Sequence, residues 1–409
     1  MKIWIKYIIG ILLGFFASWI IPFETRTSSE TLAFLTELAT RFGRYTILPV
    51  LFFGVSTAVF KLRNSKNLLR PTFHIVSITV VSAVILVAVG LISILFVKLP
   101  HIPISAGKMV VTEPIDIKQL ILSLFPYSGF EALLDGMFLL PLFLLAGLAG
   151  AGCAVDPIAS KPTTNLFDSL ARISYNIMAF FVDMLAIGMI AISCTWFLDA
   201  QSIFKSGIYT SLIIMLSIDL IIITCIIYPL ITFFYCKGSH PFKVLYASIC
   251  PILVAFFSGD TNLTLPIALR HGHESLGIKR RINAVTYPIF SIFARGGTAL
   301  VTSICFVLIL TSYSKLSVSV SDIFWIAGTS FGLSFILGEL PIGGTFTALI
   351  TMCAMYGRGF ETGYLLLKPA TFIIGSFAAA IDCATAMFGS YITAYKMKMV
   401  ENTDLHHFI

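Results

Sequence analysis

Long apolar runs recur along this chain, and they limit its fold more than any other feature of the sequence. Six of them precede residue 236, at residues 3–22, 42–61, 72–98, 136–153, 173–198 and 207–235. A helix that crosses a bilayer needs about 20 consecutive, mostly apolar residues. Charged residues make up 11% of the chain, whereas soluble globular proteins contain about 25%. The sequence therefore predicts an all-α integral membrane protein that crosses the membrane several times.

The chain carries a formal net charge of +7, but its basic residues form no patch of the kind that nucleic acids bind. They lie between the apolar runs, from Lys2 and Lys6 through the tract 61–70 to Lys396 and Lys398. Cytoplasmic loops of membrane proteins are enriched in Lys and Arg. The pattern predicts a multi-pass protein of the cytoplasmic membrane, in contact with lipid, with both termini in the cytoplasm and no nucleic-acid partner.

Two apolar segments in the second half, 241–269 and 322–357, are interrupted at their centres by polar residues. The interruptions read SGDTNLTLP and GELPIGGT. Long apolar runs follow the two segments at 283–312 and 363–396, and the first of these runs is broken by RGGT. Non-helical backbone at membrane depth must be buried or line a wet cavity, because unpaired polar groups cannot face lipid. A hairpin followed by a spanning helix, occurring twice, is typical of an inverted repeat around a central binding site. Ordinary spans kinked at Pro or Gly are the alternative.

No motif for enzyme chemistry is present: the sequence contains no phosphate-binding loop, nucleophile elbow or zinc signature. The eight cysteines are scattered without a CxxC pair, and we interpret them as small apolar fillers. His271, His273 and Glu274 form a short cluster among basic residues, for which a cytoplasmic loop is favoured over a metal site. We therefore predict no catalytic residue, no bound metal and no enzyme activity.

Four motifs in the second half resemble those of the dicarboxylate/amino acid:cation symporter family, the glutamate transporter family. The family's first hairpin reads Ser-Ser-Ser-x-Thr-Leu-Pro, and residues 260–266 read DTNLTLP. Its seventh-helix motif Asn-Met-Asp-Gly-Thr is matched in place by ARGGT at 294–298. Its second hairpin, Gly-Val-Pro-Gly-x-Gly, is similar to ELPIGG at 339–344, and Asp-Met-Gly-Arg-Thr of its last helix is similar to DCATA at 382–386.

The similarity runs in order along nearly the whole chain. Residues 130–136 resemble the family's entry to its fourth helix, and residues 44–50 resemble its second helix. The resemblance implies eight transmembrane helices, two re-entrant helical hairpins, inverted repeats, a homotrimer and an elevator-type motion of a transport domain. Cation-coupled transport of a small solute follows as the expected function.

The resemblance also implies a division of the chain into two parts. Residues 1–235 hold helices 1–6, of which 1–72 and 136–206 form mainly the scaffold and trimer contacts, while helices 3 and 6 accompany the transport domain. The transport core is residues 236–409, with hairpin 1 at about 241–269, helix 7 at about 283–312, hairpin 2 at about 322–357 and helix 8 at about 363–396.

Asp382 is an ionisable residue inside the last apolar run. Such residues are costly in a membrane and usually face the protein interior or a cavity. On a helix it shares one face with the residues at i+3, i+7 and i+11, which are Thr385, Gly389 and Thr393. The resemblance implies that its carboxylate accepts the amino group of a substrate. The alternative is a buried ion pair with Arg295.

Arg295 replaces the family's methionine next to the expected substrate and cation sites. Its guanidinium is suited to binding a carboxylate through two parallel hydrogen bonds. The family's own carboxylate-binding arginine lies on the last helix, where this chain has Thr385. Two interpretations remain open: the anion-binding arginine has moved and the substrate is acidic, or Arg295 replaces a lost cation and the substrate is neutral. Either way, we expect Arg295 within ion-pair reach of an acidic group.

The cation sites of the family are depleted in this chain. Hard cations need oxygen ligands, but the family's Asn and Asp of helix 7 are Ala294 and Gly296 here. Those of the last helix align with Gly389 and Thr393. New carboxylates, Asp260 and Glu339, lie near the two predicted hairpin tips. Each is a candidate proton carrier, since burial raises a carboxyl pKa, or else a helix cap or a partner for Arg295.

The sequence therefore predicts a secondary active transporter of an amino acid or small dicarboxylate, with no cofactor other than Na⁺ or H⁺ as coupling ion. A transport-deficient anion channel or substrate sensor is the alternative. The predicted substrate site comprises Asp260, Thr261, Asn262, Arg295, Thr298, Pro341, Gly343, Gly344, Asp382 and Thr385. The ion-coupling candidates are Asp260, Glu339, Gly389 and Thr393.

Overall fold

Helices account for all the regular structure in the computed structural model, which describes residues 2–21, 26–65, 69–97, 99–103, 117–134, 139–237, 240–313, 318–336, 340, 344–401, 403 and 408. Within these residues there is no β-strand, in agreement with the prediction of an all-α membrane protein. The first half contains α1 (Ile3–Ile20), α2 (Arg26–Arg44), α3 (Ile47–Asn64), α4 (Leu69–Phe96), α5 (Ile117–Ser123), α6 (Glu131–Leu134), α7 (Leu139–Cys153) and α8 (Lys161–Ser206).

The second half begins with α9 (Thr210–Ile221), a π-helical turn at Ile222–Ile227 and α10 (Tyr228–Tyr235), which together form one continuous helix. It continues with α11 (Pro241–Ser258), α12 (Thr261–Glu274), α13 (Arg280–Phe293), α14 (Gly296–Tyr313), α15 (Val320–Ile336), α16 (Gly344–Tyr356), a 3₁₀ segment at Gly363–Ala370 and α17 (Thr371–Lys396). The breaks predicted at the SGDT and RGGT sequences separate α11 from α12 and α13 from α14.

Eight helical segments of the described chain are long and apolar enough to cross a membrane, and this number equals the predicted one. Their identity differs at one place. The run predicted at 136–153 forms α7, whose 15 residues span only about 22 Å at 1.5 Å per residue, less than the hydrocarbon core of roughly 30 Å. The eighth candidate is α11, which the sequence assigned to a hairpin.

The helices α11 and α12 are joined by a tight turn at Gly259 and Asp260 and lie against each other. Gly259 has a φ of +61°, a left-handed conformation that glycine adopts without the steric cost of a Cβ atom. It closes α11 as its C-cap, and Asp260 opens α12 as its N-cap. The helices α15 and α16 also contact each other across the second predicted hairpin, of which residues 337–339 and 341–343 lie outside the described part of the chain.

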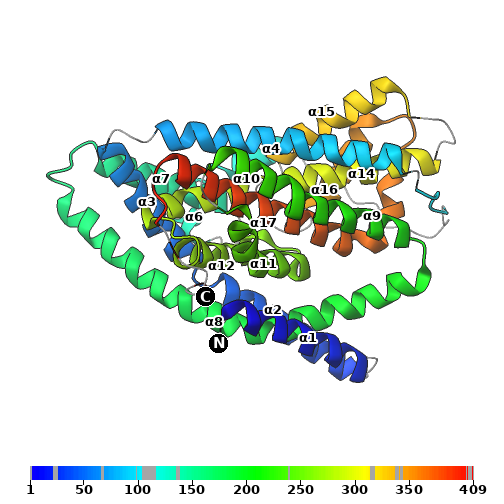
Figure 1. Ribbon diagram of the computed structural model, residues 1–409, viewed down its shortest axis with the longest axis horizontal. Helices are drawn as coiled ribbons and strands as arrows, with labels where there is room; N and C mark the ends of the chain where they lie inside the picture. The colour runs from blue at the N-terminus through cyan, green and yellow to red at the C-terminus, as the bar shows by residue number, and fades with distance from the viewer. Residues whose placement is uncertain are drawn as a thin grey trace.

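The longest helix, α8, runs along one edge of the molecule with α1 and α2 against it (Figure 1). On the other side, α4 lies along α14. Between them α17 contacts α11, α13 and α14. In the most apolar 18-residue stretch of each candidate span, buried residues make up 94% for α13–α14 and 89% for residues 363–396. The same share is 33–50% in the other six candidate spans. The centre of the molecule is therefore built from the two segments that carry the predicted site.

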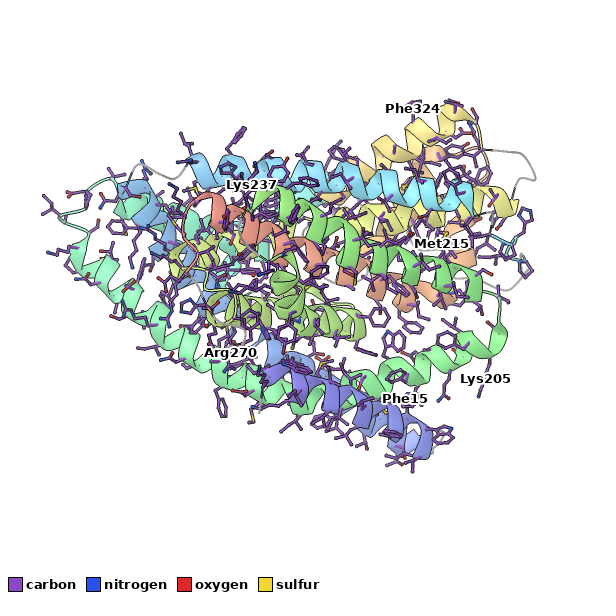
Figure 2. All side chains as sticks on the ribbon, in the orientation of Figure 1. Phe15, Lys205, Met215, Lys237, Arg270 and Phe324 are labelled. Carbon is purple, nitrogen blue, oxygen red and sulfur yellow. The ribbon has the colours of Figure 1, made fainter. Side chains whose placement is uncertain are left out.

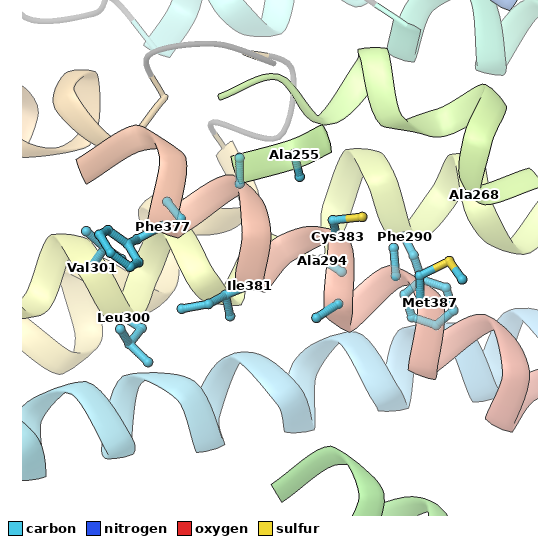
Figure 3. Packing of buried hydrophobic residues seen from close by; sticks show 14 of the residues in the cluster. Ala255, Ala268, Phe290, Ala294, Leu300, Val301, Phe377, Ile381, Cys383 and Met387 are labelled. Carbon is cyan, nitrogen blue, oxygen red and sulfur yellow. The ribbon is translucent and has the colours of Figure 1, made fainter. Parts of the chain in front are cut away.

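The packing at this centre is apolar and close. Figure 3 shows Ile381 of α17 near Leu300 and Val301 of α14, and Met387 beside Phe290 of α13. All five side chains are buried. The polar groups described below are therefore held in surroundings that contain little water.

Apolar side chains also cover the outside of the molecule. Phe15 of α1 and Phe324 of α15 are 44% and 74% exposed, and both project from its periphery (Figure 2). An outer surface of this kind is suited to lipid chains, because they offer it an apolar environment that water does not.

The two ends of the chain lie at the same end of the molecule. Trp4 and Phe408 both pack on Tyr246, with ring centroids 6.0 and 5.7 Å from that of the tyrosine. Residues just before α13 meet the segment after α17, where Lys279 N donates to Met399 O at 3.0 Å. Residues close to the two termini are therefore neighbours in the fold.

Candidate functional site

Asp382 lies near the middle of α17, is 3% exposed, and reaches the start of α14. Its Oδ1 accepts hydrogen bonds from Gly297 N at 2.6 Å and Thr298 N at 3.3 Å, and its Oδ2 accepts one from the Thr298 hydroxyl at 2.8 Å. The first N–H groups of a helix have no partner within the helix and carry a partial positive charge. The carboxylate of one helix therefore caps the N-terminus of another at the centre of the fold.

This close approach requires glycine at position 297. A Cβ atom there would lie 2.6 Å from Ile381 Cβ and 2.8 Å from Asp382 Oδ1, closer than real Cβ contacts come. The RGGT sequence thus serves two purposes. It interrupts the α13–α14 segment between Phe293 and Gly296. It also lets the N–H groups at the start of α14, which have no partner within the helix, approach α17.

Arg295 lies in the break itself and is 4% exposed. Its Nη1 is 3.9 Å from Asp382 Oδ2, within ion-pair distance but beyond a direct hydrogen bond. The structure therefore places Arg295 within ion-pair reach of an acidic residue, as the sequence suggested. Both interpretations of Asp382, as a substrate ligand and as an ion-pair partner, fit this distance.

A very small cavity borders Asp382 on the side away from α14. Its volume is about 10 Å³, close to the space that one water molecule needs. Polar side chains from α12 and α13 line it together with Asp382, and the Thr261 and Tyr287 hydroxyls are buried without a hydrogen-bond partner among the described residues. A substrate as large as an amino acid fits there only if these helices move apart.

Tyr287 and Ser291, which line this cavity from α13, were not predicted as site residues. They lie four positions apart on one face of the helix, one to two turns before the break. Tyr228 was also missed. Its hydroxyl forms a hydrogen bond with that of Thr385, and it follows directly on the π-helical turn. Such turns occur often at functional sites, but the sequence of residues 222–227 contains no signal that predicts one.

The other predicted residues of α17 are occupied in packing. The Thr385 and Thr393 hydroxyls donate to the carbonyl oxygens of Ile381 and Gly389, each at 2.8 Å. Gly389 lies against the ring of Phe290, which a Cβ atom would approach to 2.8 Å. Position 389 therefore has room for glycine but not for a larger side chain unless Phe290 moves.

Asp260 caps a helix, which was one of its alternative interpretations, and pairs with an arginine other than the expected one. Its Oδ1 caps α12 by accepting from Asn262 N at 2.8 Å, so its alternative interpretation as a helix cap has the required geometry. Its Oδ2 accepts from Arg44 Nε at 2.8 Å and from Arg44 Nη2 at 2.6 Å. The ion-pair partner is therefore Arg44 at the end of α2, and not Arg295. In the sequence Arg44 stands near the start of an apolar run, and nothing around it indicates a partner 216 positions away.

The remaining predicted residues fall into two groups. Glu339, Pro341 and Gly343 lie outside the described residues, and Gly344 is the first residue of α16. Thr261 and Asn262 are buried in the first turn of α12, and Thr261 lines the same small cavity as Asp382. The described chain thus brings together four of the predicted residues around the break, which are Thr261, Arg295, Thr298 and Asp382.

The histidine cluster lies in the last turn of α12, where we had expected a loop. His271 Nδ1 is 3.3 Å from the Ser275 hydroxyl, and His273 Nδ1 is 3.0 Å from Ile278 O. Glu274 accepts from Arg270 at 3.3 Å and from the Tyr175 hydroxyl at 3.0 Å. Each side chain has its own partner, and no group of three metal-ligating residues is formed within the described part of the chain.

Comparison of the sequence with known proteins finds a family and individual relatives. A family model described as the sodium:dicarboxylate symporter family matches residues 1–396. The human neutral amino acid transporters A and B(0) are 27% and 26% identical to the chain over 130 residues, and the bovine neutral amino acid transporter A is 27% identical over 130 residues.

These matches cover 32% of this chain and 24% of each of the relatives, so the chain matches about a quarter of their length. The family match, in contrast, extends over almost the whole chain and confirms the resemblance seen in the motifs, which is to a family of transporters and not of enzymes. The chain belongs to the sodium:dicarboxylate symporter family of multi-pass membrane transporters.

Proposed function

We propose that this chain is a secondary active symporter that carries an amino acid or a small dicarboxylate across the cytoplasmic membrane. The observation that carries the proposal is the buried carboxylate of Asp382 at the break between α13 and α14. Ionisable residues persist inside membrane proteins where they serve transport pathways or binding sites. Half-helix ends at the centre of a transporter are also the usual place for charged substrate groups.

In this proposal Asp382 accepts the amino group of the substrate, and Arg295 binds a substrate carboxylate. The two side chains lie 3.9 Å apart, so opposite charges on one small zwitterion can reach both. The Thr298 hydroxyl, which now donates to Asp382, supplies a further hydrogen bond. The cavity beside Asp382 is smaller than such a substrate, and binding therefore requires movement of the surrounding helices.

The movement that we propose is an elevator motion of a transport core against a scaffold. The scaffold comprises α1, α2, α3, α7 and α8, and forms a homotrimer. The core comprises α4, α9–α10 and α11–α17, with α11–α12 and α15–α16 as re-entrant hairpins. Contacts of α8 with α1, α2 and α3, and of α14 with α4 and α17, support this grouping. A cavity of about 440 Å³ between α2, α8, the α11–α12 turn and the start of α17 lies on the proposed boundary.

The coupling ion in our proposal is a proton, or sodium at a reduced stoichiometry. Ala294, Gly296 and Gly389 stand where the family has oxygen-bearing side chains, and Thr393 uses its hydroxyl within its own helix. The carboxylate of Asp382 is the group best placed to carry a proton in the described core. The orientation that fits the basic residues has both termini in the cytoplasm.

The test is uptake into proteoliposomes that contain the purified chain. Labelled amino acids and dicarboxylates, first ranked by the thermal stabilisation they give, are offered under a sodium gradient, a pH gradient, both, or neither. We expect accumulation against a concentration gradient, driven mainly by pH and weakly by sodium, and its loss with Asp382→Asn. A steep sodium dependence with a Hill slope above one would contradict the coupling proposal, and the absence of accumulation would contradict transport itself.

A second candidate is a channel or sensor that has lost coupled transport, and the depleted cation ligands favour it. The same liposomes distinguish the two. Stabilisation by a substrate without its accumulation indicates a sensor, and an anion current without accumulation indicates a channel.

A further inference from the structure

A second polar cavity lies away from Asp382, where α3, α8, α12 and α13 meet. Its volume is about 340 Å³. Its floor is formed by buried apolar residues, among them Leu51, Ala58, Leu269 and Pro288. These walls come from α3 and α8 on one side and from α12 and α13 on the other, so an occupant would contact helices from both halves of the chain.

The rim of this cavity is strongly basic. It is lined by Lys61, Arg172, Arg280 and Arg281, with Asp168 as the one carboxylate among the lining residues. Lys61 donates to Asp168 Oδ1, and Arg172 donates to Asp168 Oδ2 from Nε at 3.2 Å and from Nη2 at 3.0 Å. Because one carboxylate is shared by two cations, the rim retains a surplus of positive charge.

The surplus is concentrated on Arg280 and Arg281. Arg280 is positioned by neutral partners: its Nε donates to His273 Nε2 at 3.1 Å, and its guanidinium lies 4.7 Å from the centroid of the Tyr175 ring. Arg281 is exposed and forms no ion pair with another described residue. Two guanidinium groups are therefore presented at the cavity, and no carboxylate of the described residues forms an ion pair with them.

The helix start adds to this field. Arg280 is the first residue of the 14-residue helix α13, and the side chain of its N-cap residue Lys279 makes no capping hydrogen bond. The N-terminus of a helix carries a partial positive charge and favours anions. The cavity thus combines an apolar floor with a cationic rim, and charge complementarity demands an anionic, amphiphilic occupant.

The outer surface next to the cavity favours a lipid over a soluble anion. Leu166 and Ile173 lie on α8, the helix that carries Asp168 and Arg172 of the rim, and are 56% and 53% exposed. Exposed apolar residues beside a basic rim suit acyl chains below a phosphate group. Basic pockets between transmembrane helices on the cytoplasmic side are also known to bind anionic headgroups. The positive residues of the rim are among those that place this end of the molecule in the cytoplasm.

We propose that this cavity binds an anionic phospholipid of the cytoplasmic leaflet. The phosphate contacts Arg280 and Arg281, and the glycerol and upper acyl chains lie on the apolar floor. A lipid bound here connects α3 and α8 with α12 and α13. It therefore stabilises the folded chain whatever solute the protein transports.

The test measures lipid binding and thermal stability of the purified full chain in neutral detergent. Phosphatidylglycerol and phosphatidylcholine with the same acyl chains are titrated separately, and inorganic phosphate is titrated as a third ligand. We expect phosphatidylglycerol to bind saturably and to raise the melting temperature, while the other two have little effect. For Arg280→Gln/Arg281→Gln, binding should weaken roughly 10- to 30-fold, since each basic residue near a lipid headgroup contributes a few-fold to about tenfold in affinity.

The variants are chosen so that misfolding does not decide the result. Arg281→Gln alone disturbs no ion pair within the described chain and should weaken binding by several-fold. Arg41→Gln, which removes an exposed arginine of α2 (77% exposed side chain), should bind like the unaltered chain. Equal binding of both lipids, or unchanged phosphatidylglycerol binding by Arg281→Gln, would overturn the proposal. Stabilisation by phosphate equal to that by phosphatidylglycerol would assign the cavity to a soluble anion instead.

Discussion

In the described part of this fold, two arginine–aspartate pairs have a buried carboxylate, and they are held in different ways. Arg44 donates from both Nε and Nη2 to one oxygen of Asp260, at 2.8 and 2.6 Å. Arg295 lies 3.9 Å from Asp382 at its nearest. Asp382 instead accepts its short hydrogen bonds from the start of α14, where Gly297 N is 2.6 Å away. One carboxylate accepts its hydrogen bonds directly from an arginine, whereas the other accepts them from a helix N-terminus and has an arginine at ion-pair distance.

This difference indicates what each carboxylate depends on. Without Arg44, the side chain of Asp260, which is 1% exposed, loses the countercharge that serves its Oδ2. Without Arg295, Asp382 keeps the two backbone donors and the Thr298 hydroxyl. Because an uncompensated buried charge is strongly destabilising, we expect Arg44 to matter for stability and Arg295 to matter for function.

The largest expected effect is therefore that of Arg44→Met. Removing one partner of a buried ion pair costs about 3–5 kcal/mol, and this substitution keeps the apolar part of the side chain. We expect a melting temperature several degrees lower for the purified protein in detergent. A variant as stable as the unaltered chain would show that Asp260 does not depend on Arg44.

A double variant separates the charge from the contact. Asp260→Asn can still accept a hydrogen bond from Asn262 N but no longer needs a countercharge. Arg44→Met/Asp260→Asn should regain most of the stability lost in Arg44→Met, in a double-mutant cycle of thermal unfolding. Strictly additive losses would show that the two side chains do not interact.

Asp382→Asn is expected to have the next largest effect, on uptake more than on folding. The amide can still accept from Gly297 N, so the cap on α14 is largely retained. A hydrogen bond between charged groups contributes about 1.5–3 kcal/mol, and its loss lowers substrate affinity by roughly 10- to 150-fold. Uptake in proteoliposomes measures this effect, with thermal unfolding as the control. Unchanged uptake would exclude Asp382 from the substrate site.

Arg295→Met tests the other side of the comparison. We expect a loss of stability smaller than that of Arg44→Met, because Asp382 keeps its cap, together with a changed substrate affinity or ion dependence. Arg295→Lys should restore function only in part, since an ammonium group cannot form two parallel hydrogen bonds to a carboxylate. An Arg295→Ala variant with unaltered affinity and coupling would contradict a functional role.

The sequence was sufficient to predict the break at residues 294–298 and the neighbourhood of Asp382 and Arg295. Both predictions rest on the energetic cost of polar groups in an apolar environment, which hydropathy detects. The pair of Arg44 and Asp260 could not be found in this way. Its members lie 216 positions apart, and Asp260 already has an adequate local explanation as a helix cap.

Helix lengths were predicted less well than helix positions. The run expected at 173–198 is the apolar part of α8, which extends over 46 residues from Lys161 to Ser206. Hydropathy detects only the part of a helix that is suited to lipid. The helix continues on both sides of that part through polar residues, which are compatible with helical structure. Tyr287 and Tyr228 could not be predicted as site residues from hydropathy either, because tyrosine is common in apolar helices whether or not it lines a site.

The smallest expected effect is that of Arg41→Met, and it sharpens the comparison most directly. Arg41 lies on α2 only three positions before Arg44 and also pairs with a carboxylate, since its Nε donates to Glu37 Oε1 at 2.7 Å. Both side chains of that pair are exposed, at 77% and 61%. Exposed pairs four residues apart on a helix contribute only about 0.3–0.5 kcal/mol, so thermal unfolding of Arg41→Met should be nearly unchanged. A loss as large as that of Arg44→Met would assign the effect to the helix α2 itself, and the buried pair with Asp260 would no longer be needed to explain it.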